Sequence, residues 1–262
     1  MSNAIQPPGT ILGGKYRLDG VLGSGGMGTV FAAEHLLLRK RVAIKVLHDS
    51  FSSDPELTER FLREARIMTQ LEHQGVVRVT DVAQSESGLL YMVMELLEGE
   101  SLGGVLDREL TLSVSDTAAI AATMLDAVAF AHRADVIHRD LKPDNVFLLQ
   151  STSASLDLRV LDFGISKRIN SVPPSPRLTQ TGTILGTPYY MSPEQARGEP
   201  SIDHRSDIWS TGVMLYQMLS GKLPYAGESY NQIMVAIVVD PVAPLATVSE
   251  GLPPGLIDVV AR

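Results

Sequence analysis

The sequence contains no cysteine, so disulfide bonds, thiolate nucleophiles and cysteine-ligated zinc sites are excluded together. Basic residues are also scarce: 22 Lys and Arg stand against 30 Asp and Glu, which gives a net charge of −8. A surface that binds nucleic acid broadly must neutralise many phosphates, and this balance disfavours it. We therefore expect no nucleic acid among the partners.

Long hydrophobic runs are missing as well. A membrane span needs about 18 or more consecutive apolar residues. The nearest candidate, 118–131, is interrupted by Thr123 and Asp126 and is typical of an amphipathic helix. Residues 1–10 hold no Lys or Arg and no apolar core of a signal peptide. We expect a disordered leader over residues 1–14, no membrane anchor and a cytoplasmic location.

The remaining composition is that of a folded globular chain. It has 262 residues, 44% of them hydrophobic and 20% charged, which suits one large domain or two packed lobes. Residues 15–97 alternate β-prone runs with turns around one helical pattern at 53–71, and residues 98–262 are dominated by helical patterns. The strands are expected at 16–22, 29–34, 41–47, 76–83, 89–95, 146–149 and 159–161, and the long helices of the second part at 113–133, 206–220 and 229–239. Gly99, Gly103 and Gly104 are expected to loosen the chain between the two parts.

A glycine-rich segment follows the first strand. It reads Gly23, Ser24, Gly25, Gly26, Met27, Gly28. Missing β-carbons let backbone amides approach phosphate oxygens, although a plain hairpin turn explains a lone GxGxxG equally well. Because Thr29 and Val30 continue as a strand and not as a helix, a dinucleotide-binding fold is disfavoured. A glycine lid between two strands fits better.

A lysine and a glutamate accompany this segment. In the run 42–45, the period of two places Ala43 and Lys45 on one face of a strand. Lys45 is either a phosphate-binding cation or an exposed edge lysine. Glu64, on the predicted helix, either orients Lys45 or forms a weak surface pair with Arg60.

The densest chemistry lies in the second part. The run 138–145 reads His, Arg, Asp, Leu, Lys, Pro, Asp, Asn and follows an apolar helix. Asp162, Phe163 and Gly164 follow a short strand, although a lone Asp-Phe-Gly is typical of a β-turn. His138 is interpreted as a core histidine, and no histidine pair has the spacing of a zinc site.

Taken in order, these motifs resemble those of eukaryotic-type (Hanks-type) serine/threonine protein kinases, in particular the bacterial branch. The resemblance extends from about Tyr16 to the end of the chain and includes the segments 186–194 and 207–210. It implies an α+β, bilobal protein-kinase fold, with a small antiparallel β lobe at 15–97 and a mostly α lobe at 98–262. It also implies ATP and Mg²⁺ as cofactors and proteins with Ser or Thr hydroxyls as substrates.

The resemblance assigns roles by position. Asp140 would address the substrate hydroxyl and Lys142 the transferred phosphoryl group, while Asn145 and Asp162 would bind Mg²⁺. Lys142 after Asp-Leu also marks serine/threonine kinases. The nucleotide would contact the glycine segment, Lys45 with Glu64, and the following residues around the adenine: Leu22, Val30, Ala43, Met94, Glu95, Leu96, Leu97 and Phe147. His138, Phe163 and Met68 would stack as a hydrophobic spine anchored by Asp207.

Regulation is implied in the same way. Arg139 marks kinases whose activation loop is ordered when a loop phosphate pairs with that arginine. The loop offers Thr179, Thr181 and Thr183, and we expect autophosphorylation chiefly on the first two, with a kinase dimer as one route to it in trans. Thr187 is expected to be structural.

Two other functions stay open from the sequence. A pseudokinase would keep the fold as a binding or scaffolding module, and a small-molecule phosphotransferase would share the core. Intact Lys45, Asp140, Asn145 and Asp162 disfavour the first, and the segment 186–194 disfavours the second. The family continues past a helix like 256–262 and supplies an arginine to Glu194. Because neither is present, we expect an incomplete C-lobe and a Glu194 that is solvated or paired with a substitute cation.

Overall fold

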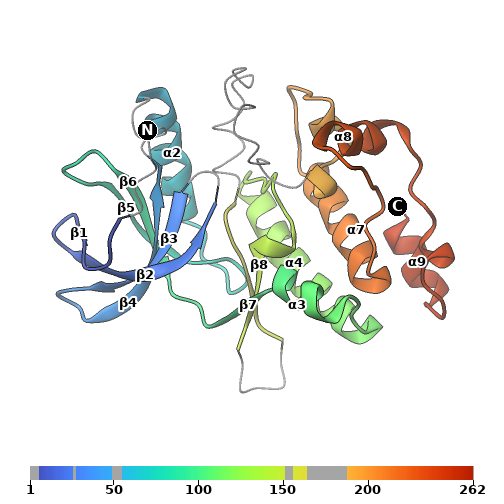
Figure 1. Cartoon of the computed structure of the whole chain (residues 1–262), viewed down its shortest axis with the longest axis horizontal. Coiled ribbons are helices and arrows are strands. Elements are labelled where there is room, and N and C mark those ends of the chain that lie inside the picture. Colours follow the sequence, from blue (N-terminus) through green and yellow to red (C-terminus); the bar gives the residue numbers. More distant parts are fainter. Residues whose placement is uncertain (1–5, 26–27, 49–54, 151–155, 164–187, 262) are drawn as a thin grey trace. The chain divides into compact units, whose positions relative to one another are not determined.

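The computed structural model describes residues 6–25, 28–48, 55–150, 156–163 and 188–261. These residues form two compact units, one up to Glu98 and the other from Gly99 onward (Figure 1). The units are described one at a time below.

The first unit is built on a six-stranded sheet. Its order is β1-β2-β3-β4-β6-β5, and each neighbouring pair is antiparallel. The bounds are Ile11–Leu12 for β1, Tyr16–Ser24 for β2, Gly28–His35 for β3, Lys40–Leu47 for β4, Val79–Gln84 for β5 and Leu90–Glu95 for β6. The five strands predicted within residues 15–97 are therefore present. The strand predicted for 76–83 begins three residues later, at Val79.

Strand β1 corrects the expected leader. Ile11 and Leu12 pair with Arg17 and Tyr16 of β2, and Leu12 is only 2% exposed within the core. The prediction of a disordered segment over 1–14 is thus wrong at these two residues. The sequence pattern missed them because two residues are too short to show a period.

The sheet sorts its side chains onto two faces. One face carries the core of the unit, which includes Leu18, Phe31, Ile44 and Val93. Residues opposite one another in the ladder share a face of the sheet. The side chains of Val30, Ala32, Ala43, Lys45 and Met94, which pair as Val30–Lys45, Ala32–Ala43 and Ala43–Met94, therefore lie on the face opposite the core. Helix α2 (Pro55–Met68) contacts β5, and its 14 residues make about four turns, as predicted.

The second unit is mostly helical. Its α-helices are α3 (Leu102–Glu109), α4 (Val114–Arg133), α6 (Pro193–Ala196), α7 (Arg205–Ser220), α8 (Tyr230–Val239) and α9 (Pro254–Val260). The described part of this unit also contains the short 3₁₀ turns η1 (Pro143–Asn145), η3 (Pro188–Tyr190) and η4 (Leu245–Thr247). A three-stranded antiparallel sheet contains β7 (Gly99–Ser101), β8 (Val146–Leu149) and β9 (Leu158–Val160), in that order.

The predicted helix starts are confirmed by their caps. Ser113 and Ser229 each accept a hydrogen bond from a backbone N–H of the first turn, of α4 and α8 respectively. In α8 the side-chain oxygen of Gln232 also accepts a hydrogen bond from Ser229 N–H, which completes a capping box. These polar caps begin the two helices where the sequence placed them.

The segment after Gly99 is more ordered than predicted. It forms β7 and then α3, which Ser101 caps and which buries Leu102, Val105 and Leu106. A β-carbon on Gly103 would lie 2.8 Å from Oδ1 of Asp144, so glycine permits close packing of α3 against η1. The glycines here serve packing, and the prediction that they loosen the chain is wrong.

Helix α4 is the one helix of the described chain that is long and apolar enough to cross a membrane. In this structure α4 packs inside the second unit, where Ile120, Met124 and Val128 are each at most 2% exposed. That burial is typical of the core helix of a globular unit.

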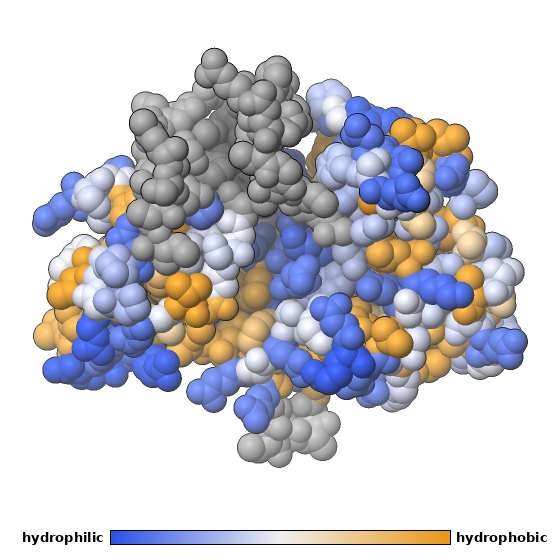
Figure 2. Space-filling view, viewed as in Figure 1, coloured by the Kyte–Doolittle hydropathy of each residue, from blue (hydrophilic) through white to orange (hydrophobic). Residues whose placement is uncertain are grey.

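Apolar side chains are exposed near the end of the chain. Val235 and Val239 of α8 and Val259 of α9 are 61%, 70% and 63% exposed, and hydrophobic colour reaches the surface around α8 (Figure 2). Leu256 and Val260 instead pack against a small cluster of Tyr216, Leu219 and Leu245. Helix α9 is therefore docked along one side only.

Candidate active site

The glycine turn of the first unit joins β2 to β3. A β-carbon on Gly28 would lie 2.3 Å from the carbonyl oxygen of Val46, so β3 can approach β4 only with glycine there. Below the turn, Gly25 N–H donates to the Gly28 carbonyl over 2.9 Å, and the Ser24 and Thr29 hydroxyls lie 3.2 Å apart. Gly26 and Met27 lie outside the described residues.

Lys45 lies on the sheet face opposite the core of the unit. The ladder pairs it with Val30 and Met92, and its side chain is half-buried. Ala43, a buried residue two positions away, shares that face, as the period of two predicted. Glu64 belongs to α2, but its side chain lies outside the description, so the Lys45–Glu64 pair stays a prediction.

The segment at the end of β6 holds the residues proposed for the adenine. Met94 is 8% exposed and pairs with Ala43 across the ladder, while Glu95 accepts a hydrogen bond from Arg78 N–H over 2.9 Å. Leu97 is half-buried just after the strand. Leu22 is 56% exposed, because it lies at an irregularity of the β2–β3 register.

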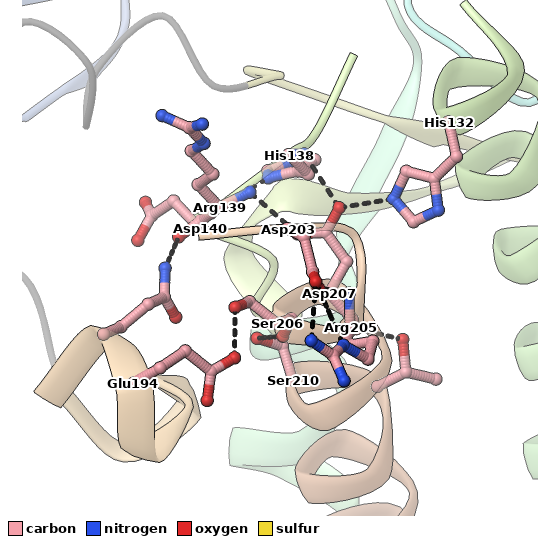
Figure 3. A network of polar contacts seen from close by, with 12 residues as sticks. His132, His138, Arg139, Asp140, Glu194, Asp203, Arg205, Ser206, Asp207 and Ser210 are labelled. Atoms are coloured by element: carbon pink, nitrogen blue, oxygen red, sulfur yellow. Dashed lines mark hydrogen bonds and ion pairs between the residues drawn. The ribbon is translucent and has the colours of Figure 1, made fainter. Parts of the chain in front are cut away.

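In the second unit, Asp207 supports the loop that follows α4. Its Oδ2 accepts hydrogen bonds from His138 N–H at 2.8 Å and lies 2.7 Å from His132 Nε2. Its Oδ1 accepts from Arg139 N–H at 2.8 Å (Figure 3). The predicted anchor is confirmed: one carboxylate of α7 fixes two consecutive amides of the loop.

This carboxylate is ionised in a buried place. Asp207 is fully buried, and burial alone would raise its pKa. The hydrogen bonds from His132 and from the backbone N–H groups of His138 and Arg139 favour the charged form and hold the pKa below the usual range. The pKa of Asp207 is lowered overall, so the side chain carries its negative charge in the folded protein at neutral pH.

His138 is a fully buried core histidine, as predicted. Its Nε2 lies 2.7 Å from the Leu161 carbonyl oxygen, and its Nδ1 accepts from Asp140 N–H at 3.3 Å. A carbonyl oxygen can only accept, so Nε2 carries the proton. The ring also packs against Phe163 in a tilted arrangement, with centroids 4.8 Å apart and an interplanar angle of 49°, which confirms that contact of the expected spine.

The loop presents Asp140 and Lys142 on either side of a buried residue. Leu141 is 1% exposed, whereas the side chains of Asp140 and Lys142 are 27% and 21% exposed. Lys142 Nζ lies 3.4 Å from Asp140 Oδ2. The Asp140 carbonyl accepts a hydrogen bond from Asn145 Nδ2 at 2.8 Å, so a turn of the loop is closed by a side chain. A carboxylate and an ammonium group are thereby held side by side.

Asp162 follows Leu161, whose backbone is hydrogen-bonded to this loop. Leu161 N–H donates to the Asn145 carbonyl over 2.8 Å, and its own carbonyl faces His138 Nε2. Asp162 itself has a positive φ of 52°, which non-glycine residues adopt rarely and which is typical of functional sites. The second unit thus brings Asp140, Lys142, Asn145 and Asp162 together.

The donor set suits a hard cation. Asn145 commits its amide nitrogen to Asp140, which leaves its amide oxygen, and Asp162 offers a carboxylate. Among the residues described, no group of three or more His, Cys, Asp or Glu could hold a metal ion. Mg²⁺ at phosphate sites typically takes one or two protein ligands and completes its shell with phosphate and water, and these two residues fit that pattern.

Glu194 of α6 has a hydroxyl partner. Ser206 Oγ donates to its Oε1 at 2.5 Å, and no ion pair of Glu194 is found in the described part of the chain. Partial burial would raise its pKa, but the hydrogen bond from Ser206 lowers it below the ordinary value. The donor found is a serine hydroxyl and not the substitute cation that was one alternative, while the carboxylate is only half-buried, so the alternative of a solvated carboxylate is not contradicted.

Sequence reasoning missed three residues of this network: His132, Gln195 and Ser206. Gln195 Nε2 donates to the Arg139 carbonyl over 2.7 Å, across 56 residues of sequence. Each bond joins residues far apart in the chain, and no local pattern signals such a partner. The position of His132, near the end of an apolar helix that leads into the loop, was the one available hint.

The remaining predicted site residues are Phe147 and the threonines of the predicted activation loop. Phe147 is half-buried in β8 opposite Ser101. Thr179, Thr181, Thr183 and Thr187 lie outside the described residues, so the predictions on the activation loop remain predictions.

The sequence is similar to a known protein family and to several known proteins. The model of the protein kinase domain family matches residues 16–251. Serine/threonine-protein kinase pkn3 of Myxococcus xanthus is 44% identical over 215 residues, which cover 82% of this chain and 39% of that protein. Serine/threonine-protein kinase PknA of Mycobacterium tuberculosis is 38% identical over 256 residues, which cover 96% of this chain and 57% of that protein. The chain therefore spans about half the length of these relatives.

A solved structure supports the fold. A double mutant of the PknI kinase domain of Mycobacterium tuberculosis matches with a TM-score of 0.72 and 22% identity, over 93% of this chain and 85% of that one. The predicted α+β, bilobal kinase fold is confirmed. The family match, the bacterial relatives and the loop geometry agree, and the chain belongs to the protein kinase domain family, in its bacterial serine/threonine branch.

Proposed function

We propose that this protein transfers the γ-phosphate of ATP to Ser or Thr hydroxyls of protein substrates. The observation that carries the proposal is the loop in which Asp140 and Lys142 lie 3.4 Å apart above the buried Asp207. Phosphoryl transfer requires little covalent chemistry from a protein, and its rate comes from positioning and charge neutralisation. A rigid loop with one carboxylate and one cation is suited to both tasks.

Asp140 and Lys142 act on the two reacting groups. The substrate hydroxyl oxygen forms a bond to the γ-phosphorus while the bond from that phosphorus to the β,γ-bridging oxygen breaks, and ADP leaves. Asp140 orients the hydroxyl and accepts its proton, and Lys142 offsets negative charge on the transferred group. Their salt bridge keeps both side chains beside each other before the substrate binds.

Asn145 and Asp162 are the residues that would hold Mg²⁺, through an amide oxygen and a carboxylate. When bound, Mg²⁺ neutralises phosphate charge. The chain contributes the placement of these ligands, because Leu161 ties the backbone before Asp162 to Asn145 and to His138. The positive φ of Asp162 is maintained by the same ties.

The first unit supplies the proposed nucleotide contacts. Lys45 holds the α- and β-phosphates, oriented by Glu64, and the turn at 23–28 offers backbone N–H groups to phosphate oxygens. In this unit, the adenine would contact the apolar and hinge residues assigned by the resemblance: Leu22, Val30, Ala43, Met94, Glu95 and Leu97. The resemblance also assigns Phe147, which lies in β8 of the second unit.

Control of the activity is proposed at the activation loop. A phosphate on Thr179, Thr181 or Thr183 would pair with Arg139, whose backbone is already fixed at its N–H by Asp207. A kinase dimer is one arrangement in which one copy phosphorylates the other.

Phosphate transfer from ATP, measured with and without Mg²⁺, tests the proposal. Radiolabelled γ-phosphate should appear on Ser or Thr of a generic protein substrate such as myelin basic protein or casein, and only with Mg²⁺. Label on a sugar or amino-alcohol metabolite alone would support a small-molecule phosphotransferase. Nucleotide binding without any transfer would support a pseudokinase, and either result would overturn the proposal.

A further inference from the structure

Gln195 uses both ends of its side-chain amide. The oxygen accepts a hydrogen bond from Ser192 N–H at 3.1 Å, which forms half of the capping box of α6. The nitrogen donates to the Arg139 carbonyl at 2.7 Å. The first contact is local and stabilises a helix start. The second contact reaches the loop that carries Asp140, and no helix cap requires it.

The Arg139 backbone is held on both sides. Its N–H is bonded to Asp207 and its carbonyl to Gln195, and its φ of 64° lies in the left-handed region, which costs a non-glycine residue free energy. Such a conformation persists only where neighbouring groups fix it. The carbonyl of Arg139 belongs to the peptide whose nitrogen is that of Asp140. Whatever orients this carbonyl therefore orients the backbone from which the Asp140 side chain starts.

We infer that Gln195 is a positioning residue for Asp140, acting through the Arg139 carbonyl. The inference rests on the proposed function, since it assigns Asp140 the substrate hydroxyl. Asp207 and His138 fix the N–H groups on this stretch, and Asn145 fixes the Asp140 carbonyl. Gln195 supplies the bond to the remaining carbonyl between them. Helix α6 thereby controls the catalytic loop by one hydrogen bond.

The substitution Gln195→Glu separates the two contacts. A glutamate keeps the acceptor for Ser192 N–H, and glutamate is a preferred residue at this capping position. At pH 8 it has no donor for the Arg139 carbonyl, so two acceptors face each other. Near pH 5.5 a protonated carboxyl could donate again. The matched control is Gln232→Glu, the same substitution at the same position of the α8 capping box, on an exposed residue.

We expect Gln195→Glu to lower kcat about 10-fold or more at pH 8, with KM for ATP changed less than about 2-fold. Its kcat relative to wild type should rise as the pH falls to 5.5. The neighbouring titratable and charged groups are Glu194 on α6, Asp207 on α7, and His138, Arg139, Asp140 and Lys142 on the loop. Comparing variant and wild type at each pH cancels their titration. Gln232→Glu should match wild type throughout.

Hydrogen–deuterium exchange of the peptide covering 139–145 gives a second readout that needs no activity. It should be faster in Gln195→Glu than in wild type at pH 8, and the ratio should approach one at pH 5.5. Equal exchange at pH 8 together with unchanged kcat would overturn the inference. If wild type transfers no phosphate, the proposed function fails, and the exchange ratio still decides whether Gln195 holds the loop.

Discussion

The Ser206 hydroxyl donates a hydrogen bond to the Glu194 carboxylate over 2.5 Å. Ser206 is fully buried and also accepts a hydrogen bond from Ser192 Oγ at 3.1 Å. The start of α7 is thereby tied to Ser192, the N-cap of α6, and to Glu194 in its first turn. Removal of the Ser206 hydroxyl takes away one hydrogen-bond donor of a half-buried carboxylate.

Ser206→Ala should therefore destabilise the protein by about 1 kcal/mol, the typical net contribution of one hydrogen bond, because the half-buried carboxylate keeps its other donors and access to water. Because the hydrogen bond lowers the pKa of Glu194, this loss should be greater at pH 7 than at pH 4. Urea unfolding at both pH values measures it. Ser87→Ala, which removes an exposed serine hydroxyl bonded to Ser85, is the control and should change little. A variant as stable as wild type at pH 7 would contradict the prediction.

Asp207→Asn should be more damaging. It replaces a buried charge that receives two backbone N–H groups and lies against His132, and loss of a buried charged partner typically costs about 3–5 kcal/mol. We expect a lower urea midpoint and a loss of phosphate transfer. The control is Asp203→Asn, four positions before Asp207 in the sequence. It removes an exposed carboxylate that pairs with Arg205, and it should have little effect on the free energy of unfolding. Similar behaviour of the two variants would refute the structural role of Asp207.

The pH dependence of stability should follow the same carboxylate. Asp207 has a lowered pKa in the folded protein, so its stabilising contribution is complete above the unfolded value of about 3.9 and is lost as the pH falls through the folded value. The difference in unfolding free energy between wild type and Asp207→Asn should be constant near neutral pH. It should shrink at pH 3. A constant difference down to pH 3 would argue against the shift.

Asp140→Asn and Asp162→Asn should fail in different ways. Each is expected to lower phosphate transfer about 100-fold or more while the fold is retained. Asp140→Asn should keep Mg²⁺-dependent nucleotide binding, because it alters the group for the hydroxyl. Asp162→Asn should weaken that binding, because it alters a proposed metal ligand. Calorimetric titration with a non-hydrolysable ATP analogue separates them, and near-normal turnover by a folded Asp140→Asn would be decisive against its role.

Autophosphorylation should occur between Arg177 and Arg197, chiefly on Thr179 and Thr181. Incubation with Mg-ATP followed by tryptic digestion and mass spectrometry would find the phosphates. The Asp140→Asn variant, incubated alone, should stay unmodified, and wild type added to it should modify it if the reaction occurs in trans. An unmodified segment in active wild type would contradict this prediction.

The sequence predicted those parts of the fold that depend on local pattern. Ser113 and Ser229 stand at the starts of α4 and α8 because a cap and an apolar period coincide there. Helix α3 was missed because Gly103 and Gly104 lower helix propensity, and only packing against Asp144 explains the first of them.

The candidate site divides in the same way. The resemblance assigned roles to Asp140, Asn145 and Asp162 through short motifs that can be read locally in the sequence, and those roles stay predictions. Such motifs could not locate His132, Gln195 or Ser206, since each acts on a residue that is distant in sequence. Side-chain hydrogen bonds of this kind follow from tertiary packing, which no local period encodes.

The long sequence separation in one of these contacts has a consequence for how the chain folds. The N–H groups of His138 and Arg139 bond to a carboxylate 69 and 68 residues later in the chain. During synthesis from the N-terminus, the catalytic loop emerges well before α7 exists. A contact of such separation also carries the entropic cost of closing a long loop. The backbone around Asp140 can therefore be held by Asp207 only once α7 has been synthesised.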